Sequence, residues 1–290
     1  MGPFVLFDRH SDPAAGRISS YFSKLFILTG NTGFFRYGLL DTEKNSVIAL
    51  ADYRLENVPK DQEYLDEIRK LIASDEILAK KHPSVIIGID SPYHTLVPEA
   101  FFTPEQSNAY LEFNFRLPDP MMNLTDRVEE LGAVNLSAIP DHPGKLLSEV
   151  FPGAAFVHGS TAMIRAFFLH HKDNPGNSAI YLHVKSHSID LAAFADNKLI
   201  YFNSFLIDSK EDILYFTLNL AEQLSLVPGH LHLYLSGSVD PGSEIHLLLE
   251  KYIRQISYTD SFSTLKFSLQ SESDAVRNYF GLLGLTLCGS

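Results

Sequence analysis

The residues best suited to chemistry in this sequence lie in short loops that follow apolar runs. The first loop reads Thr29-Gly30-Asn31-Thr32-Gly33. Backbone N–H groups bind phosphate oxygens, and a glycine lets a phosphate approach the backbone closely. The second loop reads Lys185-Ser186-His187-Ser188, and its lysine carries a charge that phosphates attract. A third candidate segment, Gly237-Ser238, follows a later apolar run.

Histidines form a second set of candidate ligands. His183 and His187 share one face of a strand because side chains alternate with a period of two, and His230 and His232 do the same. Zinc binds such pairs, but no third ligand is indicated. Exposed or hydrogen-bonded histidines are therefore the better interpretation, and no metal site is predicted.

Composition restricts the partners and the compartment. The net charge is −12, without the run of lysines and arginines that nucleic-acid binding needs. The single cysteine, Cys288, cannot form an internal disulfide. No apolar run approaches the length of about 20 residues that spans a membrane. We therefore expect a cytoplasmic protein that binds neither nucleic acid nor membrane.

Strands must position these loops, and the hydrophobic pattern predicts a similar set of strands in each half of the chain. The first half predicts strands at 24–28, 34–40 and 46–55, a helix from Pro59, a strand at 85–89 and a helix from Thr103. The second half predicts strands at 179–184, 188–195 and 198–207, a helix from Ser209, a strand at 230–235 and a helix from Ser243. Both halves read β-β-β-α-β-α, at an offset of 155 residues from Leu28 to His183.

This repeat predicts two similar lobes. We expect an irregular segment at residues 1–22, lobe I at 23–174 and lobe II at 175–290. The boundary is placed near Asp173–Asn177, where Asn, Pro and Gly occur together. The predicted fold class is α/β, with a mixed five-stranded sheet flanked by helices in each lobe.

A duplicated unit of this order resembles the actin-like ATPase superfamily, in which each lobe has a ribonuclease H-like fold. The resemblance covers residues 23 to 290. More narrowly, the sequence looks like an uncharacterised bacterial family of unknown function with that fold. The segments behind the closer resemblance are 93–98, 111–114, 203–205 and 211–215.

The resemblance implies a site for ATP and magnesium, but the motifs depart from the pattern. The acid that opens the first phosphate loop is replaced by Leu28, which cannot hold magnesium because that ion prefers oxygen ligands. In the second motif, Asp-x-Gly-Gly-Gly-Thr-x-Asp, the first acid corresponds to His183, the glycines are replaced, and Asp190 is kept. Asp90 follows a buried strand, at a position where actin-like enzymes place a polar group of the cleft, but directly before Ser91-Pro92 it equally fits the role of a turn former.

These departures favour a pseudoenzyme that keeps the fold and acts through a protein partner, because folds persist after their sites are lost. On this interpretation no cofactor is required. Two alternatives remain: a divergent ATP-dependent kinase or ATPase with rebuilt loops, and a small-molecule sensor that uses the cleft between the lobes. The sequence does not identify the partner, and it leaves a homodimer open.

Overall fold

The structure is a computed structural model that describes residues 4–12, 22–30, 33–55, 62–176, 178–226, 231–269 and 272–289. The chain divides into two compact units. Unit 1 holds Met1–Met163, Leu265–Gln270 and Leu282–Ser290, and unit 2 holds Ile164–Thr264 and Ser271–Gly281. The lobe boundary near Asp173–Asn177 stays a prediction.

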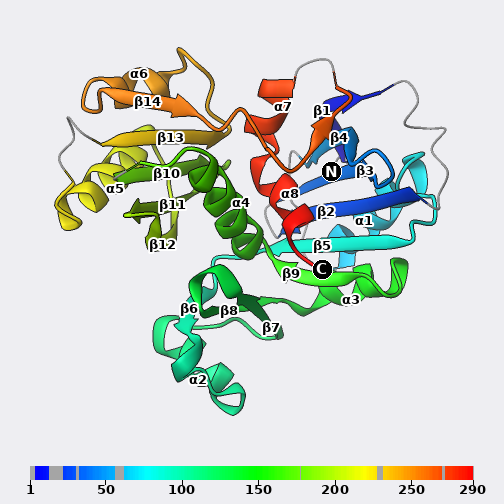
Figure 1. Cartoon of the computed structure of the whole chain (residues 1–290). Helices are drawn as coiled ribbons and strands as arrows, with labels where there is room; N and C mark the ends of the chain where they lie inside the picture. Colours follow the sequence, from blue (N-terminus) through cyan, green and yellow to red (C-terminus); the bar gives the residue numbers. More distant parts are fainter. Residues whose placement is uncertain are drawn as a thin grey trace. The chain divides into compact units, whose positions relative to one another are not determined.

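Unit 1 is built on a mixed seven-stranded sheet with the order β1-β4-β3-β2-β5-β9, in which β15 also pairs with β4 (Figure 1). Its strands are β1 (Val5–Ser11), β2 (Ser23–Gly30), β3 (Phe34–Asp41), β4 (Ser46–Arg54), β5 (Ser84–Asp90), β9 (Ala155–His158) and β15 (Lys266–Phe267). Strands β2, β3 and β4 form an antiparallel meander, and β5 and β9 extend the sheet in parallel from β2. The meander and the buried strand after it confirm the sequence prediction.

Helices α1 (Gln62–Ser74) and α3 (Asp141–Val150) cover one face of this sheet. Their apolar stripes, which include Ile68 and Leu147, pack on alternate residues of the strands such as Ile27 and Tyr37. The alternation arises because successive side chains of a strand point to opposite faces. Helix α4 (Gly159–Asp173) follows β9 directly.

A small three-stranded sheet is inserted between β5 and β9, with the order β6-β8-β7. Its elements are β6 (His94–Pro98), α2 (Ser107–Asn114), β7 (Met121–Val128), β8 (Ala133–Pro140) and the 3-10 turns at 99–101, 104–106 and 129–131. The sequence also predicts strands at 126–131 and 133–139 and a helix from Thr103. The second strand is confirmed as β8 and the helix as α2, whereas the first overlaps β7 only at residues 126–128, and β6 was not predicted.

Unit 2 repeats the core of unit 1 in a five-stranded sheet with the order β12-β11-β10-β13-β14. Its elements are β10 (Ser178–Val184), β11 (Ser188–Ala195), β12 (Lys198–Leu206), α5 (Lys210–Gln223), β13 (His232–Gly237), α6 (Glu244–Glu250), β14 (Gln255–Tyr258) and α7 (Glu272–Asn278). Helix α8 (Phe280–Gly284) and a 3-10 turn at 285–287 follow α7. Helix α5 begins with the predicted cap, since Ser209 and Asp212 form a capping box.

The two sheets confirm the predicted duplication. Strand β2 lies between an antiparallel neighbour, β3, and a parallel neighbour, β5. Strand β10 lies in the same way between β11 and β13. The equivalent strands Lys24–Leu28 and Ala179–Val184 therefore occupy equivalent places in two similar sheets.

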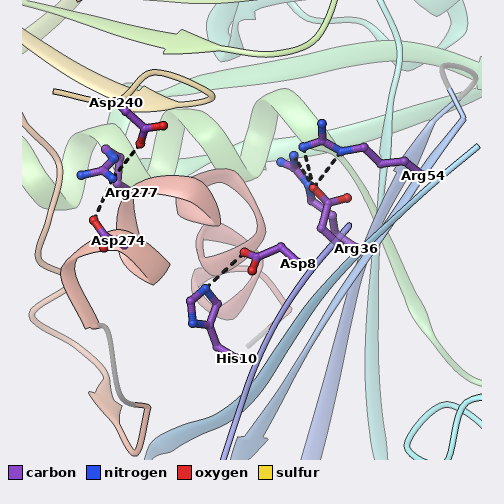
Figure 2. A network of polar contacts seen from close by, with 8 residues as sticks. Asp8, His10, Arg36, Arg54, Asp240, Asp274 and Arg277 are labelled. Carbon is purple, nitrogen blue, oxygen red and sulfur yellow. Dashed lines mark hydrogen bonds and ion pairs between the residues drawn. The ribbon is translucent and has the colours of Figure 1, made fainter. Parts of the chain in front are cut away.

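Charged side chains are used within each unit to hold neighbouring elements together. In unit 1, Arg36 and Arg54 both donate to Asp52, at distances of 3.0 and 2.8 Å, and Arg36 and Asp52 are cross-strand partners (Figure 2). In unit 2, Arg277 of α7 donates to Asp240 and Asp274 (Figure 2). In the described part of the chain, no helix is long and apolar enough to cross a membrane.

The expectation of irregular structure at the N-terminus is wrong for residues 5–11, which form the edge strand β1 on β4. Arg9 makes this attachment specific. Its guanidinium lies 2.5 Å from the Asp75 carboxylate and 2.8 Å from the Tyr53 hydroxyl. Tyr53 and Tyr37 also donate to Asp75, which is only 5% exposed. A partner 66 residues away is not visible in the local pattern of β1.

We predict that Asp75→Asn lowers the free energy of unfolding by about 2 kcal/mol at pH 7, because a buried network of charge-assisted hydrogen bonds loses the negative charge and one of the two acceptor oxygens of Asp75. Burial alone raises the pKa of Asp75, but hydrogen bonds from Tyr53 and the Leu78 and Ile77 N–H groups, with the charge of Arg9, hold that pKa below its usual value. Its stabilisation is therefore complete above pH 4 or so and is lost as the pH falls through the folded-state pKa.

Denaturant unfolding at a series of pH values checks this, and Asp66→Asn is the matched control. Asp66 lies on α1 with its side chain 52% exposed and pairs with Arg69 at the surface, so its loss should cost less than about 0.5 kcal/mol. Equal acid sensitivity in the wild type and Asp75→Asn would contradict the prediction.

We also predict that Leu220→Asp unfolds the protein or makes it insoluble. Leu220 lies on the apolar stripe of α5 and is 3% exposed, so an aspartate there is a buried carboxylate without a partner, at a cost of about 4 kcal/mol or more. Tyr215→Asp, on the same helix at a position 63% exposed, should leave the melting temperature nearly unchanged. A soluble Leu220→Asp with the wild-type melting temperature would show that this stripe is not buried.

Candidate functional site

The first candidate loop begins at the carboxyl end of β2, and its hydroxyl is used inside the fold. Thr29 is fully buried and its Oγ1 donates a 2.8 Å hydrogen bond to the Phe34 carbonyl oxygen. Tyr64 of α1 donates to the Gly30 carbonyl oxygen at 2.6 Å. The loop is thus held to the next strand and to α1. Asn31 and Thr32 lie outside the described residues.

The two glycines of this loop have structural reasons to be glycine. Gly30 pairs with Asp90 of β5, and a Cβ on Gly30 would lie 2.8 Å from the Asp90 carbonyl oxygen. Gly33 has a φ of 72°, a left-handed conformation that side chains disfavour. A close approach of two backbones explains Gly30, and a left-handed backbone conformation explains Gly33, with or without a ligand.

An apolar contact occupies the place where the actin-like pattern has its first acid. Leu28 is 9% exposed. A Cβ on Gly88 of β5 would lie 2.9 Å from side-chain atoms of both Leu28 and Leu285, so these side chains fill the space above Gly88. A carboxylate at position 28 would replace an apolar packing contact with a buried charge.

The second candidate loop is the tight hairpin between β10 and β11. The Lys185 N–H donates to the Ser188 carbonyl oxygen at 2.9 Å, so Ser186 and His187 form a two-residue turn, and both are exposed. Lys185 Nζ lies 2.9 Å from Asp190 Oδ2, and the carboxylate is 1% exposed. Ser204 donates to the other oxygen at 2.6 Å. The lysine charge is therefore matched by a buried carboxylate of its own hairpin.

The third segment lies beside this hairpin. Gly237 has a φ of 81°, and a Cβ there would lie 2.1 Å from the Val184 carbonyl oxygen. Ser238 is exposed, and its N–H donates to the same carbonyl at 2.8 Å. His183, which stands where the actin-like pattern has an acid, is 3% exposed, with Nδ1 2.9 Å from the Ser236 hydroxyl.

The structure therefore brings the candidate residues together in two groups, one in each unit. Thr29, Gly30 and Gly33 lie at the carboxyl end of β2 in unit 1. The unit 2 candidates share the carboxyl ends of β10 and β13; they are Lys185, Ser186, His187, Ser188, Gly237 and Ser238.

Two of the described histidine candidates have side-chain hydrogen-bond partners, and the third, His187, is exposed in the hairpin turn. His183 contacts Ser236, and His232 Nε2 lies 2.8 Å from the Ser257 hydroxyl. His230 lies outside the described residues. Among the residues that the structure describes, no group of three or more histidine, cysteine, aspartate or glutamate side chains could hold a metal ion.

A buried polar network at the end of β9 escaped the sequence analysis. His158 is fully buried, with its backbone N–H bound to Asp126 at 2.7 Å and its ring nitrogens within 2.6 and 3.1 Å of the Ser160 and Ser91 hydroxyls. Asn135 of β8 donates to Ser160 at 2.8 Å. A serine beside a histidine can serve nucleophilic catalysis. Here His158 and Ser160 are both buried, and their hydrogen bonds connect the small sheet to the start of α4. The only trace of this network in the sequence is the pair of polar residues Asn135 and Ser137 within the mostly apolar strand β8.

Asp90 is the acid at the carboxyl edge of unit 1. It ends β5, between β2 and β9, and is partly exposed. A Cβ on Gly159, the first residue of α4, would lie 2.9 Å from Asp90 Oδ1. The carboxylate therefore lies against the start of a helix, where the helix dipole stabilises negative charge.

Comparison by sequence finds one family. The family model described as "Protein of unknown function (DUF3822)" matches residues 15–256. None of the curated proteins compared with this chain matches it significantly.

Comparison by structure finds the actin-like ATPase fold. A Bacteroides thetaiotaomicron protein with that fold and unknown function superposes with a TM-score of 0.78 at 21% identity, over 93% of this chain and 97% of the other. A structure of the PilM–PilN type IV pilus biogenesis complex superposes with a TM-score of 0.65 at 12% identity, over 91% and 97% of the two chains. The predicted fold is thereby confirmed, but the sheet of unit 1 has seven strands rather than the five predicted, because β1 and β15 also pair with β4.

We predict that Gly237→Ala costs about 2 kcal/mol or more, because alanine meets both a strained φ and the Val184 carbonyl oxygen. Thermal unfolding measures the effect. Gly176→Ala is the control, since a Cβ at Gly176 meets nothing within 4 Å. An unchanged melting temperature for Gly237→Ala would mean that Gly237 is not needed for packing.

Proposed function

The chain belongs to the DUF3822 family of proteins of unknown function, and we propose that it is a non-catalytic protein of the actin-like ATPase fold that acts by binding another protein. The observation that carries the proposal is the ion pair between Lys185 and Asp190. Lys185 is the cationic residue of the candidate phosphate loops, and its charge already neutralises a carboxylate inside unit 2.

The surroundings of this ion pair support the same proposal. Phosphoryl transfer relies on metal ions and positioned donors that stabilise the phosphate oxygens. The positions at which the actin-like pattern has acids hold Leu28, packed above Gly88, and His183, bonded to Ser236. The Thr29 hydroxyl donates a hydrogen bond to the Phe34 carbonyl oxygen. The candidate groups thus serve local packing.

Binding to a protein partner is supported by the exposed aromatic residues around α2. Phe101 and Phe113 are 74% and 88% exposed, and α2 buries only Leu111. Exposed aromatic side chains are favoured anchors of protein interfaces. The PilM–PilN structure is that of a protein complex, so a protein of this fold binds another protein there.

A divergent ATPase is the second candidate, and Asp90 is the observation that favours it. This carboxylate lies at the carboxyl edge of the unit 1 sheet, beside Gly30 and Gly159, where an oxygen ligand for magnesium would be useful. The small-molecule sensor stays a prediction without a specific observation in its favour.

We predict that magnesium-ATP neither stabilises the protein nor is hydrolysed by it. A ligand at 100 times its dissociation constant stabilises by about 2.7 kcal/mol, so thermal shift with saturating magnesium-ATP, together with phosphate release over hours, checks both statements. Wild-type turnover above background that Lys185→Met abolishes would contradict the proposal and favour the ATPase.

Two variants separate a structural from a nucleotide-binding role of Lys185. Lys185→Met should cost about 3 kcal/mol without changing the response to ATP, because it leaves the buried Asp190 without its cation. Lys185→Met/Asp190→Asn should recover much of that loss. A Lys185→Met variant as stable as the wild type would remove the observation on which the proposal depends.

The partner is sought by affinity purification from the native cell with the wild type and with Phe101→Ser/Phe113→Ser in parallel. Both positions are exposed, so the double variant should fold normally. We expect a protein that the wild type retains and the double variant loses. Identical sets of retained proteins would exclude this aromatic surface as the binding site.

A further inference from the structure

The two most exposed large apolar side chains among the residues that the structure describes both lie beside the small sheet of unit 1. Phe113, on α2, is 88% exposed, and Phe101, in the turn that follows β6, is 74% exposed. Helix α2 lies on the side of the small sheet away from β9 (Figure 1). Large apolar side chains gathered at one place on a surface mark interaction sites.

The segments that carry the two phenylalanines are fastened to each other. The Tyr110 hydroxyl of α2 donates a 2.6 Å hydrogen bond to the Phe101 carbonyl oxygen, which holds the turn against the helix. Phe113 follows Tyr110 by three residues, so these two side chains are neighbours on the helix surface. Leu111 is fully buried in an apolar cluster with β8 and fixes α2 on the sheet. An ordered platform of this kind loses less freedom when it binds.

Glutamates surround the two phenylalanines. Residues 98–132 carry seven acidic residues, two arginines and no lysine. The turn at 129–131 lies beside the turn that carries Phe101, because the Glu99 N–H donates to the Gly132 carbonyl oxygen at 2.9 Å. Five exposed glutamates, together with Phe101 and Phe113, form what we call the α2 surface; they are Glu99, Glu105, Glu112, Glu129 and Glu130. Glu99 lies 3.7 Å from Arg127, and the surface keeps a surplus of negative charge.

We propose that the α2 surface binds a basic amphipathic helix of a partner protein, whose apolar stripe covers the two phenylalanines while its lysines or arginines face the glutamates. Charge complementarity gives the basic character, because opposite charges across an interface speed association and exclude wrong partners. The inference rests on the proposed binding function, which it deepens by naming the chemistry of the partner.

The helical form of the partner follows from the elements of the α2 surface. A helix and 3-10 turns use their backbone groups internally, so they offer no ladder to which a strand could be added. Recognition must therefore occur through side chains. An amphipathic helix presents apolar and basic side chains on one face, with its own backbone already hydrogen-bonded.

Two other occupants are disfavoured by charge. A second copy of this chain has a net charge of −12, so two acidic proteins would have to meet at an acidic surface. A membrane leaflet that contains anionic lipids would repel the same glutamates.

Binding of a designed peptide to the full chain tests the proposal. The probe is a fluorescent peptide of about 18 residues, made of lysine and leucine, whose leucines share one face of a helix. We expect saturable one-to-one binding that weakens about tenfold from low to high salt, because salt screens exposed charges. Two control peptides, one with the leucines spread around the helix and one with glutamate for lysine, should bind about tenfold more weakly or less.

Two variants separate the apolar from the charged part of the α2 surface. Phe101→Ser/Phe113→Ser should weaken binding of the probe about tenfold or more, because aromatic anchors carry much of the free energy of an interface. Glu105→Gln/Glu112→Gln/Glu130→Gln should weaken it about fivefold and reduce its salt dependence.

Matched controls make the same changes elsewhere. Leu206→Ser/Tyr215→Ser removes two side chains of unit 2 that are 73% and 63% exposed. Glu76→Gln/Glu211→Gln/Glu222→Gln removes three exposed negative charges. Both should bind the probe as the wild type does. Unchanged circular dichroism for each variant excludes misfolding as the cause of any loss.

Three outcomes would overturn the proposal. The first is equal binding of the probe and the spread-leucine peptide, or binding that the phenylalanine variant leaves unchanged. The second is a wild-type dimer in sedimentation that the phenylalanine variant makes monomeric, which would assign the α2 surface to a second copy. The third is binding to vesicles of anionic phospholipid that the same variant abolishes, which would assign it to a membrane.

Failure of this inference can be told from failure of the proposed function. A cellular protein that the phenylalanine variant loses, but that high salt and the glutamine variant both retain, would exclude a basic partner and leave the binding function standing. Turnover of ATP that Lys185→Met abolishes would contradict the proposed function itself.

Discussion

The rest of the structure depends on one constraint: the central strand of each sheet is buried, so every polar group at its end needs a partner inside its own unit. All but one residue of β2 and of β10 are buried. In unit 1 the Thr29 hydroxyl meets this requirement through the Phe34 carbonyl oxygen. In unit 2 His183 meets it through Ser236, and Asp190, which lies opposite His183 on β11, is likewise paired with Lys185 and Ser204. Buried polar groups are satisfied in this way because an unpaired one costs free energy without compensation.

The same constraint accounts for the character of the candidate loops. In a nucleotide-binding protein the ends of these strands can leave donors for phosphate oxygens. Here Leu28 and Leu285 pack above Gly88, and Gly237 lies against the Val184 carbonyl oxygen. A fold does not by itself specify a function, because the same fold hosts many different sites. This is the physical basis on which we propose a binding role.

The edge strands of the two large sheets differ from each other in the charge of their side chains. The β1 edge of unit 1 carries charged residues, and Arg9 fastens it to Asp75, Tyr37 and Tyr53. The β12 edge of unit 2 carries mostly apolar residues, and it packs on α5 through the stacking of Phe205 on Phe216. A charged edge resists further pairing, whereas an apolar one accepts it. The outer strands of two similar sheets thus carry different kinds of side chain.

The sequence by itself determined the repeat of elements, the buried strands, the helix caps such as Ser209, and the replacement of the acids by Leu28 and His183. These features are local, because hydrophobic periodicity and residue type act over a few neighbouring residues. Only the tertiary structure decided which polar groups meet. Ser91 and His158 are 67 residues apart, and Arg9 and Asp75 are 66.

The histidines show the same division. His170 and His171 in sequence are an unremarkable pair, but α4 packs them against Tyr181, and burial lowers the pKa of His170 to about 4. Strand β1 was missed because its pairing with β4 and its anchor, Asp75, lie far along the chain. Partners of this kind are chosen by strand register and helix packing, which form only when distant segments are buried together.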